Sequence, residues 1–367
     1  MNAERLHRIL LELQKEYEVK FVLVKLNDVR NHLQNQVNQP QQPTHQQNLV
    51  AELKNLKEIL ENSDTNSFSP GWNQVVDEIG GTNLFGNNLL ERIESIFESN
   101  QITPAAALQE INQIVELSQS LKEAIDNVVD GFYKLKIGSD NLEQGECELG
   151  YSIPRIYVEN KLSSLNKEIS ELNFILNNIS EVVSGEKQEF EVKTISSSNF
   201  LLFVVVGLSV ADVLSRAVER IINNYKTILE IKLLRNQLKE KGVPEKETKG
   251  IEEHANNSMK EEIKSIASDI IKDYYKGKDA GRKNELSNGI TIAFNKLANR
   301  IDNGFNVEIR VAPLPEPTST EDLTETDKEK HQIIETIASR VKKMEFINTS
   351  GDRILKLEEG ESQKKKD

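Results

Sequence analysis

The chain has 367 residues, enough for two domains, and its 59 acidic against 46 basic residues give a formal net charge of −13. This acidity disfavours a general attraction to nucleic acid or anionic lipid, and the single cysteine, Cys147, excludes an intrachain disulfide. Because the first residues also lack the basic and then apolar order of a signal peptide, we expect a cytoplasmic protein.

Residues 1–143 are predicted to form an N-terminal helical region. Apolar residues recur with helical spacing over residues 4–35, and leucines do so again over residues 48–62. Between them, the Gln/Asn-rich stretch 34–48 contains two prolines, and we expect it to be a flexible loop. The short apolar run 19–24 inside the first helix could form a strand instead, because periodicity does not settle runs of that length.

A longer helix is predicted to follow within the same region. Thr103 and Pro104 form a favourable start, since a capping hydroxyl is followed by a proline at the first helical position. Apolar residues then alternate four and three positions apart to about residue 135, which creates a continuous seam along one face. We expect this seam to contact a partner through Ile111, Ile114, Leu121, Ile125 and Val128.

Residues 144–245 are predicted to form a central core of alternating strands and helices. Leu149, Tyr151 and Ile153 alternate with polar or small residues, which indicates a strand. Residues 158–183 carry the clearest heptad pattern of the chain, typical of a coiled-coil or bundle helix. This second predicted partner seam includes Leu162, Leu165, Ile169, Leu172, Leu176 and Ile179.

The most apolar stretch of the chain, residues 199–214, follows a short strand pattern at 190–194. It could be a buried strand that ends at Gly207, the first turns of a helix, or a membrane-spanning helix. A span is disfavoured because the stretch is short and contains Asp212. We therefore expect a core element, with helix continuing to about residue 240. The apolar part consists of Phe200, Leu201, Leu202, Phe203, Val204, Val205 and Val206.

Two linkers are predicted in the C-terminal half, one at 241–244 with the polar sequence after it, and one at 314–325. Residues 246–313 between them are predicted to hold a pair of helices and a strand. Residues 326–367 are predicted to hold a helix, a hairpin within 344–357, and a disordered tail. These elements together predict a mainly helical fold, an elongated bundle or coiled coil with a small mixed β-sheet in its central and C-terminal part.

The two heptad seams carry our leading functional hypothesis. Each seam must be covered by its own chain, by a second copy or by another protein. We therefore expect a non-enzymatic helical scaffold or interaction subunit of a bacterial or phage assembly, which associates with a protein partner or with itself through these seams.

Two other functions are left open. A membrane-active protein would release residues 199–214 from its bundle, an arrangement that resembles the α-helical pore-forming toxins in outline only. A metal-dependent nuclease would use Glu191 and Lys193, which share one face of the predicted strand. The same strand would place Phe190 and Val192 toward the core, so an ordinary amphipathic strand explains the pattern equally well.

No other pattern predicts a catalytic, cofactor, metal or small-molecule site. The five histidines lack ligand spacing, and Cys147 has no neighbouring cysteine or histidine. A basic cluster near two tyrosines could contact phosphates, but a solvated helix end is favoured because the chain is acidic. The residues of this cluster are Lys276, Lys278, Arg282 and Lys283.

Overall fold

The computed structural model divides into two compact units, Met1–Asn141 and Leu142–Asp367, each with its own hydrophobic core. We call them unit 1 and unit 2 and describe each separately. The residues that the structure describes are 3–196, 200–314, 324–344 and 353–360.

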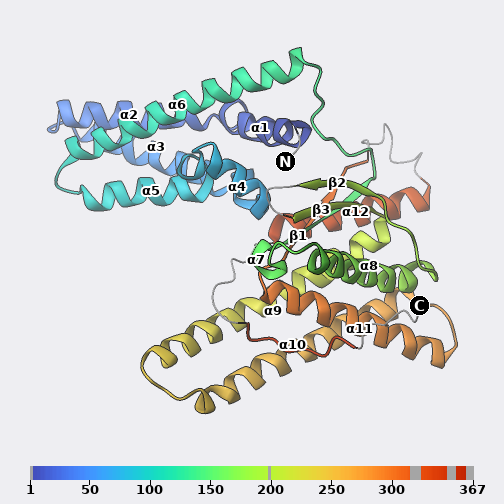
Figure 1. Ribbon diagram of the computed structural model, residues 1–367. Helices are drawn as coiled ribbons and strands as arrows, with labels where there is room; N and C mark the ends of the chain where they lie inside the picture. The colour runs from blue at the N-terminus through green and yellow to red at the C-terminus, as the bar shows by residue number, and fades with distance from the viewer. Residues whose placement is uncertain (1–2, 197–199, 315–323, 345–352, 361–367) are drawn as a thin grey trace. The chain divides into compact units, whose positions relative to one another are not determined.

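Unit 1 contains only helices among its described residues. They are α1 (Ala3–Glu18), α2 (Val22–Asn38), α3 (Pro43–Glu61), α4 (Pro70–Glu78), α5 (Gly86–Ser99) and α6 (Pro104–Lys134), with the short 3₁₀ helices η1 (Asp64–Ser67) and η2 (Thr82–Leu84). Figure 1 shows α2, α3, α5 and α6 as neighbouring rods that pack in the pairs α2–α3, α2–α6, α3–α5 and α5–α6. As predicted, the long helix begins with a proline at its first position.

Two sequence expectations for unit 1 are corrected. The helix over 4–35 is interrupted after α1, because Phe21 adopts the left-handed conformation with φ 58°, and the run 19–24 forms no strand. The loop expected at 34–48 shrinks to residues 39–42, since α2 continues to Asn38 and α3 starts at Pro43. Glutamine and asparagine are tolerated in helices, so the break comes only where Pro40 restricts the residue before it.

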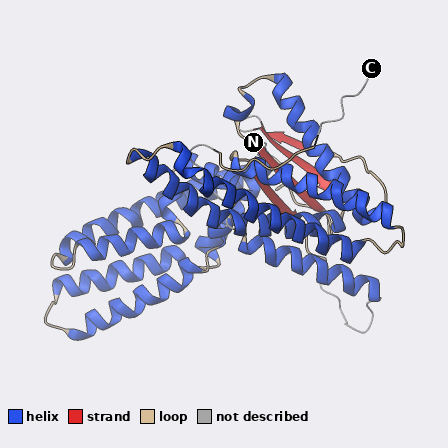
Figure 2. Cartoon of the chain, turned by 90° about the horizontal axis from the view of Figure 1, so that it is seen from below, coloured by secondary structure: helices blue, strands red, loops and turns tan. Residues whose placement is uncertain are grey.

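Unit 2 combines helices with one antiparallel sheet. Its strands are β1 (Cys147–Ile153), β2 (Val192–Ser196), β3 (Phe200–Val206) and β4 (Asn306–Val311), and its helices are α7 (Arg155–Val158), α8 (Leu162–Ser184), α9 (Leu208–Glu240), α10 (Glu245–Tyr274), α11 (Ala280–Asp302) and α12 (Glu325–Lys343). The strand order is β2-β3-β1-β4, and every described pairing is antiparallel (Figure 2). The mainly helical fold with a small sheet is thus confirmed, whereas the mixed sheet is not, because each strand runs opposite to its neighbour.

The apolar stretch forms the interior strand β3, and α9 begins directly after Gly207. Leu202, Val204 and Val206 face the helical core, while Leu201 and Phe203 are buried on the opposite face. Of the structures that we considered for this stretch, a strand followed by a helix is therefore the one observed. None of the helices among the described residues has the length and apolarity needed to cross a membrane.

The close approach of β1 and β3 requires a glycine. Gly150 lies opposite Phe203 in the ladder, and a Cβ atom built at Gly150 would lie 2.8 Å from the Phe203 ring. Real side chains do not approach so closely, so Phe203 occupies the space that any larger residue at 150 would need.

Asp212 joins three helices of unit 2 at the start of α9. Its Oδ1 accepts a hydrogen bond from Arg340 of α12 at 2.6 Å, and its Oδ2 accepts one from the Tyr274 hydroxyl of α10 at 2.7 Å. Burial raises the pKa of Tyr274 above its ordinary value, and the hydrogen bond to Asp212 raises it further. The charge that interrupts the apolar stretch is thus a buried anchor between helices.

The other differences concern boundaries. The polar sequence after residue 244 belongs to α10, which starts at Glu245, and α8 starts at Leu162 because Glu159 and Asn160 both have positive φ angles. Most of the linker expected at 314–325, and part of the hairpin expected within 344–357, lie outside the described residues. Residues 353–360 are described and contain no strand. Of the tail expected to be disordered, residues 358–360 are described, and the Glu358 carbonyl accepts a hydrogen bond from Asn295 of α11, whereas residues 361–367 lie outside the described part of the chain.

Candidate functional site

The heptad seam of α8 is largely covered within unit 2. Leu162 and Ile169 are 81% and 36% exposed, and the buried stripe also contains Glu168 and Glu171. The stripe is rotated from the predicted one because these two glutamates pair with cations of α11. The covered members of the predicted seam are Leu172, Leu176 and Ile179, with Leu165 partly buried.

The seam of α6 is covered in the same way within unit 1. Ile111, Ile114 and Ile125 are buried in the core of unit 1, in which α6 packs on α1, α2 and α5, and Leu121 packs at the edge of the same core. Val128 is 43% exposed. Most of both seams is therefore covered by its own chain, which is one of the three coverings that the sequence left open.

The residues proposed for a nuclease are not brought into a metal-binding arrangement. Lys193 lies in β2 and forms an ion pair with Glu146 at 3.1 Å, while Glu191 is exposed just before the strand. Val192 is 50% exposed, not buried as predicted, because the ladder shifts register between Val192 and Thr194 on an edge strand. The described part of the chain holds no cluster of three or more His, Cys, Asp or Glu side chains suited to a metal.

The basic residues considered for phosphate contact do lie together, at the connection between α10 and α11. Arg282 is already paired, with Glu181 at 2.6 Å and with Glu285 at 2.7 Å. The exposed lysines of this connection are Lys276, Lys278 and Lys283. Carboxylates therefore occupy the one guanidinium of the cluster.

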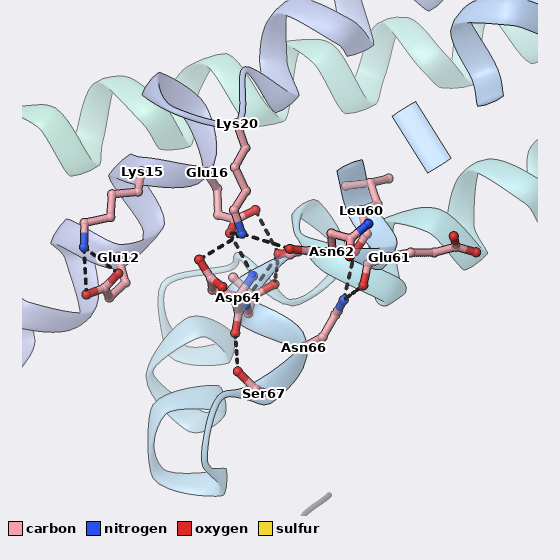
Figure 3. Close-up of polar contacts among 12 residues, drawn as sticks. Glu12, Lys15, Glu16, Lys20, Leu60, Glu61, Asn62, Asp64, Asn66 and Ser67 are labelled. Atoms are coloured by element: carbon pink, nitrogen blue, oxygen red, sulfur yellow. Dashed lines mark hydrogen bonds and ion pairs between the residues drawn. The ribbon is translucent and has the colours of Figure 1, made fainter. Parts of the chain in front are cut away.

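A buried carboxylate also connects α1 to η1 in unit 1 (Figure 3). Glu16 is 0% exposed and accepts hydrogen bonds from the Ser63 hydroxyl at 2.8 Å, the Asp64 backbone N–H at 3.1 Å and the Lys20 ammonium at 2.9 Å. Donors from the chain itself satisfy both of its oxygens, so the arrangement holds the fold together and offers no open position for a ligand.

The most unusual polar arrangement involves residues 353–360, which we call the C-terminal segment. Figure 1 shows it in dark red beside α10 and α11. Ile354, Leu355 and Leu357 are buried to 0%, 1% and 6% exposure and belong to the core of unit 2. The segment is thus bound by the helices as a ligand would be, although it is neither helix nor strand.

Two asparagine side chains bind the backbone of the C-terminal segment. On α10, the Asn256 amide donates to the Ile354 carbonyl at 3.0 Å and accepts from the Lys356 N–H at 2.6 Å. On α11, the Asn299 amide donates to the Leu357 carbonyl at 3.0 Å and accepts from the N–H of the same residue at 3.1 Å. Each amide therefore pairs with the segment as a neighbouring β-strand would.

Asp302, at the end of α11, holds the start of the segment. Its Oδ2 accepts from the backbone N–H groups of Ile354 and Leu355, both at 2.7 Å. Its Oδ1 accepts from the Tyr225 hydroxyl and lies 3.5 Å from the Lys232 ammonium, both on α9. Burial raises the pKa of Tyr225, and the nearby Asp302 charge raises it further.

The acidic end of the segment meets a buried ionic cluster. The Glu359 carboxylate accepts from the Asn299 amide at 2.8 Å and from Arg300 at 3.4 Å, and it lies 3.7 Å from the Lys296 ammonium. Burial alone would lower the pKa of Arg300, but Tyr151, Glu168 and Glu359 raise it, so the guanidinium stays charged. Earlier on α11, the Asn295 amide donates to the Glu358 carbonyl at 2.9 Å.

This chemistry follows from laying an extended chain on helices. The backbone groups inside a helix already bond to one another, so only side chains can satisfy a peptide that lies across them. Asparagine is suited to this task because its amide carries both a donor and an acceptor. Leu355 and Leu357 bond to α11 and Lys356 bonds to Asn256 of α10, whereas Ile354 bonds to both helices, through its N–H to Asp302 and through its carbonyl to Asn256.

Sequence reasoning missed this site because it followed apolar residues alone. Asn295, Asn299 and Asp302 are spaced four and three positions apart, so they form a polar stripe on α11 beside its apolar one. That stripe is the one available signal, and it does not reveal its occupant 52 to 63 residues farther along the chain. No family model, curated protein or solved structure matches the chain.

Proposed function

We propose that this protein is a non-enzymatic interaction subunit that binds an extended segment of a partner protein. The site would be the surface formed by Asn256, Asn295, Asn299 and Asp302, which we call the segment-binding surface. The observation that carries the proposal is the pairing of these side chains with backbone N–H and C=O groups of residues 353–360.

Backbone-directed bonds support recognition of a peptide in general, because every residue except proline offers the same two groups. In peptide recognition, main-chain hydrogen bonds supply affinity and side-chain pockets supply specificity. The segment-binding surface provides the first through its amides and carboxylate. The second comes from the hydrophobic core of unit 2, in which Ile354, Leu355 and Leu357 are buried.

The proposal keeps the interaction role expected from the sequence but moves it away from the buried seams. Association as a coiled coil is proposed as a second contact only through Leu162 and Ile169, which are exposed and one heptad apart on α8. A cytoplasmic location remains part of the proposal and is supported by the single cysteine.

The experiment uses the full chain with Leu355→Asp, which places a charge where a leucine is now buried and so weakens docking of the chain's own segment. A fluorescent synthetic peptide of residues 353–360 is then titrated, and its anisotropy is measured. We expect saturable binding. Adding Asn256→Ala should weaken this binding about 5- to 150-fold. The peptide then loses the partner of two backbone groups, which together cost about 1–3 kcal/mol of binding free energy.

The matched control is Asn257→Ala, since Asn257 neighbours Asn256 on α10 and is exposed. It should leave peptide affinity unchanged. Circular dichroism and thermal unfolding confirm that each variant is folded. A folded Leu355→Asp chain that does not bind the peptide, or one that binds it equally well with and without Asn256→Ala, would contradict the proposal.

A further inference from the structure

We infer that the C-terminal segment is an internal competitor for the segment-binding surface, and that the partner segment shares its chemistry. The partner would present two adjacent apolar residues, any residue except proline, a third apolar residue, any residue, and then an acidic residue. This inference rests on the proposed function and specifies both the ligand and its regulation.

The apolar positions are defined by burial. Ile354, Leu355 and Leu357 are at most 6% exposed, so each contributes apolar area that only a side chain of similar size can replace. Lys356 between them has a 65% exposed side chain, so the third position tolerates any residue except proline, which lacks the N–H that donates to Asn256. Glu358, whose side chain is 87% exposed, gives the same freedom at the fifth position.

The acidic position is defined by charge. The Glu359 carboxylate lies within reach of Arg300 and Lys296, at 3.4 and 3.7 Å, and also accepts from Asn299 at 2.8 Å. A carboxylate at this position therefore meets two cations and an amide donor. A neutral or basic residue there would lose these charge-assisted contacts.

Exchange between two occupants follows from the apolar surface that the segment covers. If the segment left and nothing replaced it, water could bond to Asp302 and Asn299 in place of the four lost backbone contacts, but the apolar surface now packed against Ile354, Leu355 and Leu357 would also be exposed to water. Exposing apolar surface is costly. The surface is thus expected to change from one bound segment to another, and to spend little time empty.

Covalent attachment favours the internal segment. A tethered ligand acts at an effective concentration on the order of millimolar for a short connection, and a free partner must compete against this. Wild type should therefore bind an external segment much more weakly than a chain whose own segment cannot dock. A partner of suitable chemistry, presented at high local concentration, would displace the internal segment.

The test titrates the labelled peptide of residues 353–360 into wild type and into the full-length Leu355→Asp chain. We expect the dissociation constant to be at least about tenfold larger for wild type. Peptides with Leu357→Ala or Glu359→Ala should bind the Leu355→Asp chain at least several-fold more weakly. The control peptide Arg353→Ala should bind equally well, because the Arg353 side chain is exposed.

The outcomes separate the two levels of the argument. Equal affinity for wild type and the Leu355→Asp chain would overturn internal competition, and equal affinity of all peptides would overturn the ligand chemistry; both results leave the proposed function intact. Absence of peptide binding to either chain would overturn the proposed function itself. If Leu355→Asp fails to fold, full-length Leu357→Asp replaces it, because Leu357 lies farther along the segment and is slightly more exposed.

Discussion

Asp302 connects the C-terminal segment to the core of unit 2, so substituting it is a direct test of the energetics. In Asp302→Asn the shape is kept and the charge is lost. The amide oxygen can still accept from the Ile354 and Leu355 N–H groups, but Lys232 is left without its counter-ion. Lys232 is 1% exposed, and among the described residues its ammonium has no hydrogen-bond partner and one ion pair, with Asp302 at 3.5 Å.

The expected loss of stability follows from leaving the buried Lys232 ammonium without a counter-ion. Removing one partner of a buried ion pair destabilises a protein by about 3–5 kcal/mol, because the remaining charge is buried without compensation. For a unit of this size, each kcal/mol lowers the midpoint of thermal unfolding by about 2–4 °C. We therefore expect Asp302→Asn to lower the midpoint of unit 2 by about 6–20 °C.

Adding Lys232→Met should recover about 2 kcal/mol or more, since the double variant buries neither charge. Thermal unfolding followed by far-ultraviolet circular dichroism measures the midpoints, and urea unfolding followed in the same way measures the free energies. The fluorescence of Trp72, the single tryptophan, monitors unit 1 in the same samples. A double variant no more stable than Asp302→Asn, or an Asp302→Asn chain within about 0.5 kcal/mol of wild type, would refute the reasoning.

Three further predictions concern the core of unit 2. Gly150→Ala should destabilise the protein by about 1–3 kcal/mol in urea unfolding, because the new methyl group overlaps Phe203, and Phe203→Leu in the same chain should recover part of the loss. Burial and the hydrogen bond to Asp212 hold the pKa of Tyr274 above the value of about 10 that it has in the unfolded chain. The protonated hydroxyl therefore contributes fully to stability below pH ~10, and this contribution is lost as the pH rises above ~10. The loss of stability measured above pH ~10 should be smaller in Tyr274→Phe than in wild type. Burial raises the pKa of Cys147 to about 11, so its alkylation by iodoacetamide at neutral pH, followed by mass spectrometry, should be far slower in the native than in the urea-unfolded chain, and equal rates would contradict its burial.

Periodicity predicted the elements whose local pattern and tertiary environment agree. The strand around Tyr151, the strand ending at Val311 and the proline-started helix α6 are all observed near their expected bounds. The pattern could not say what covers an apolar stripe. Leu172 and Ile111 read as open partner positions, yet each is buried by helices of its own unit, which come from elsewhere in the sequence.

The errors have identifiable physical causes. Phe21 adopts a left-handed conformation that breaks a helix its neighbours favour, and no sequence rule expects this of a bulky residue. The register shift between Val192 and Thr194 on an edge strand reverses which side chains are exposed. The candidate site depends on pairing Asn299 with a segment nearly 60 residues away, and spacing along one helix carries no information about such a contact.

The central claim is that side chains on helices bind the backbone of an extended segment, and N-methylation of the peptide tests it most directly. A methyl group on the Leu357 nitrogen removes the N–H that donates to Asn299 at 3.1 Å and changes no side chain. A methyl group on the Glu358 nitrogen is the control, since that N–H makes no bond to the segment-binding surface among the described contacts. With the Leu355→Asp chain, we predict at least about tenfold weaker binding for the first peptide and little change for the second. Equal affinity of both methylated peptides and the unmodified one would contradict the claim.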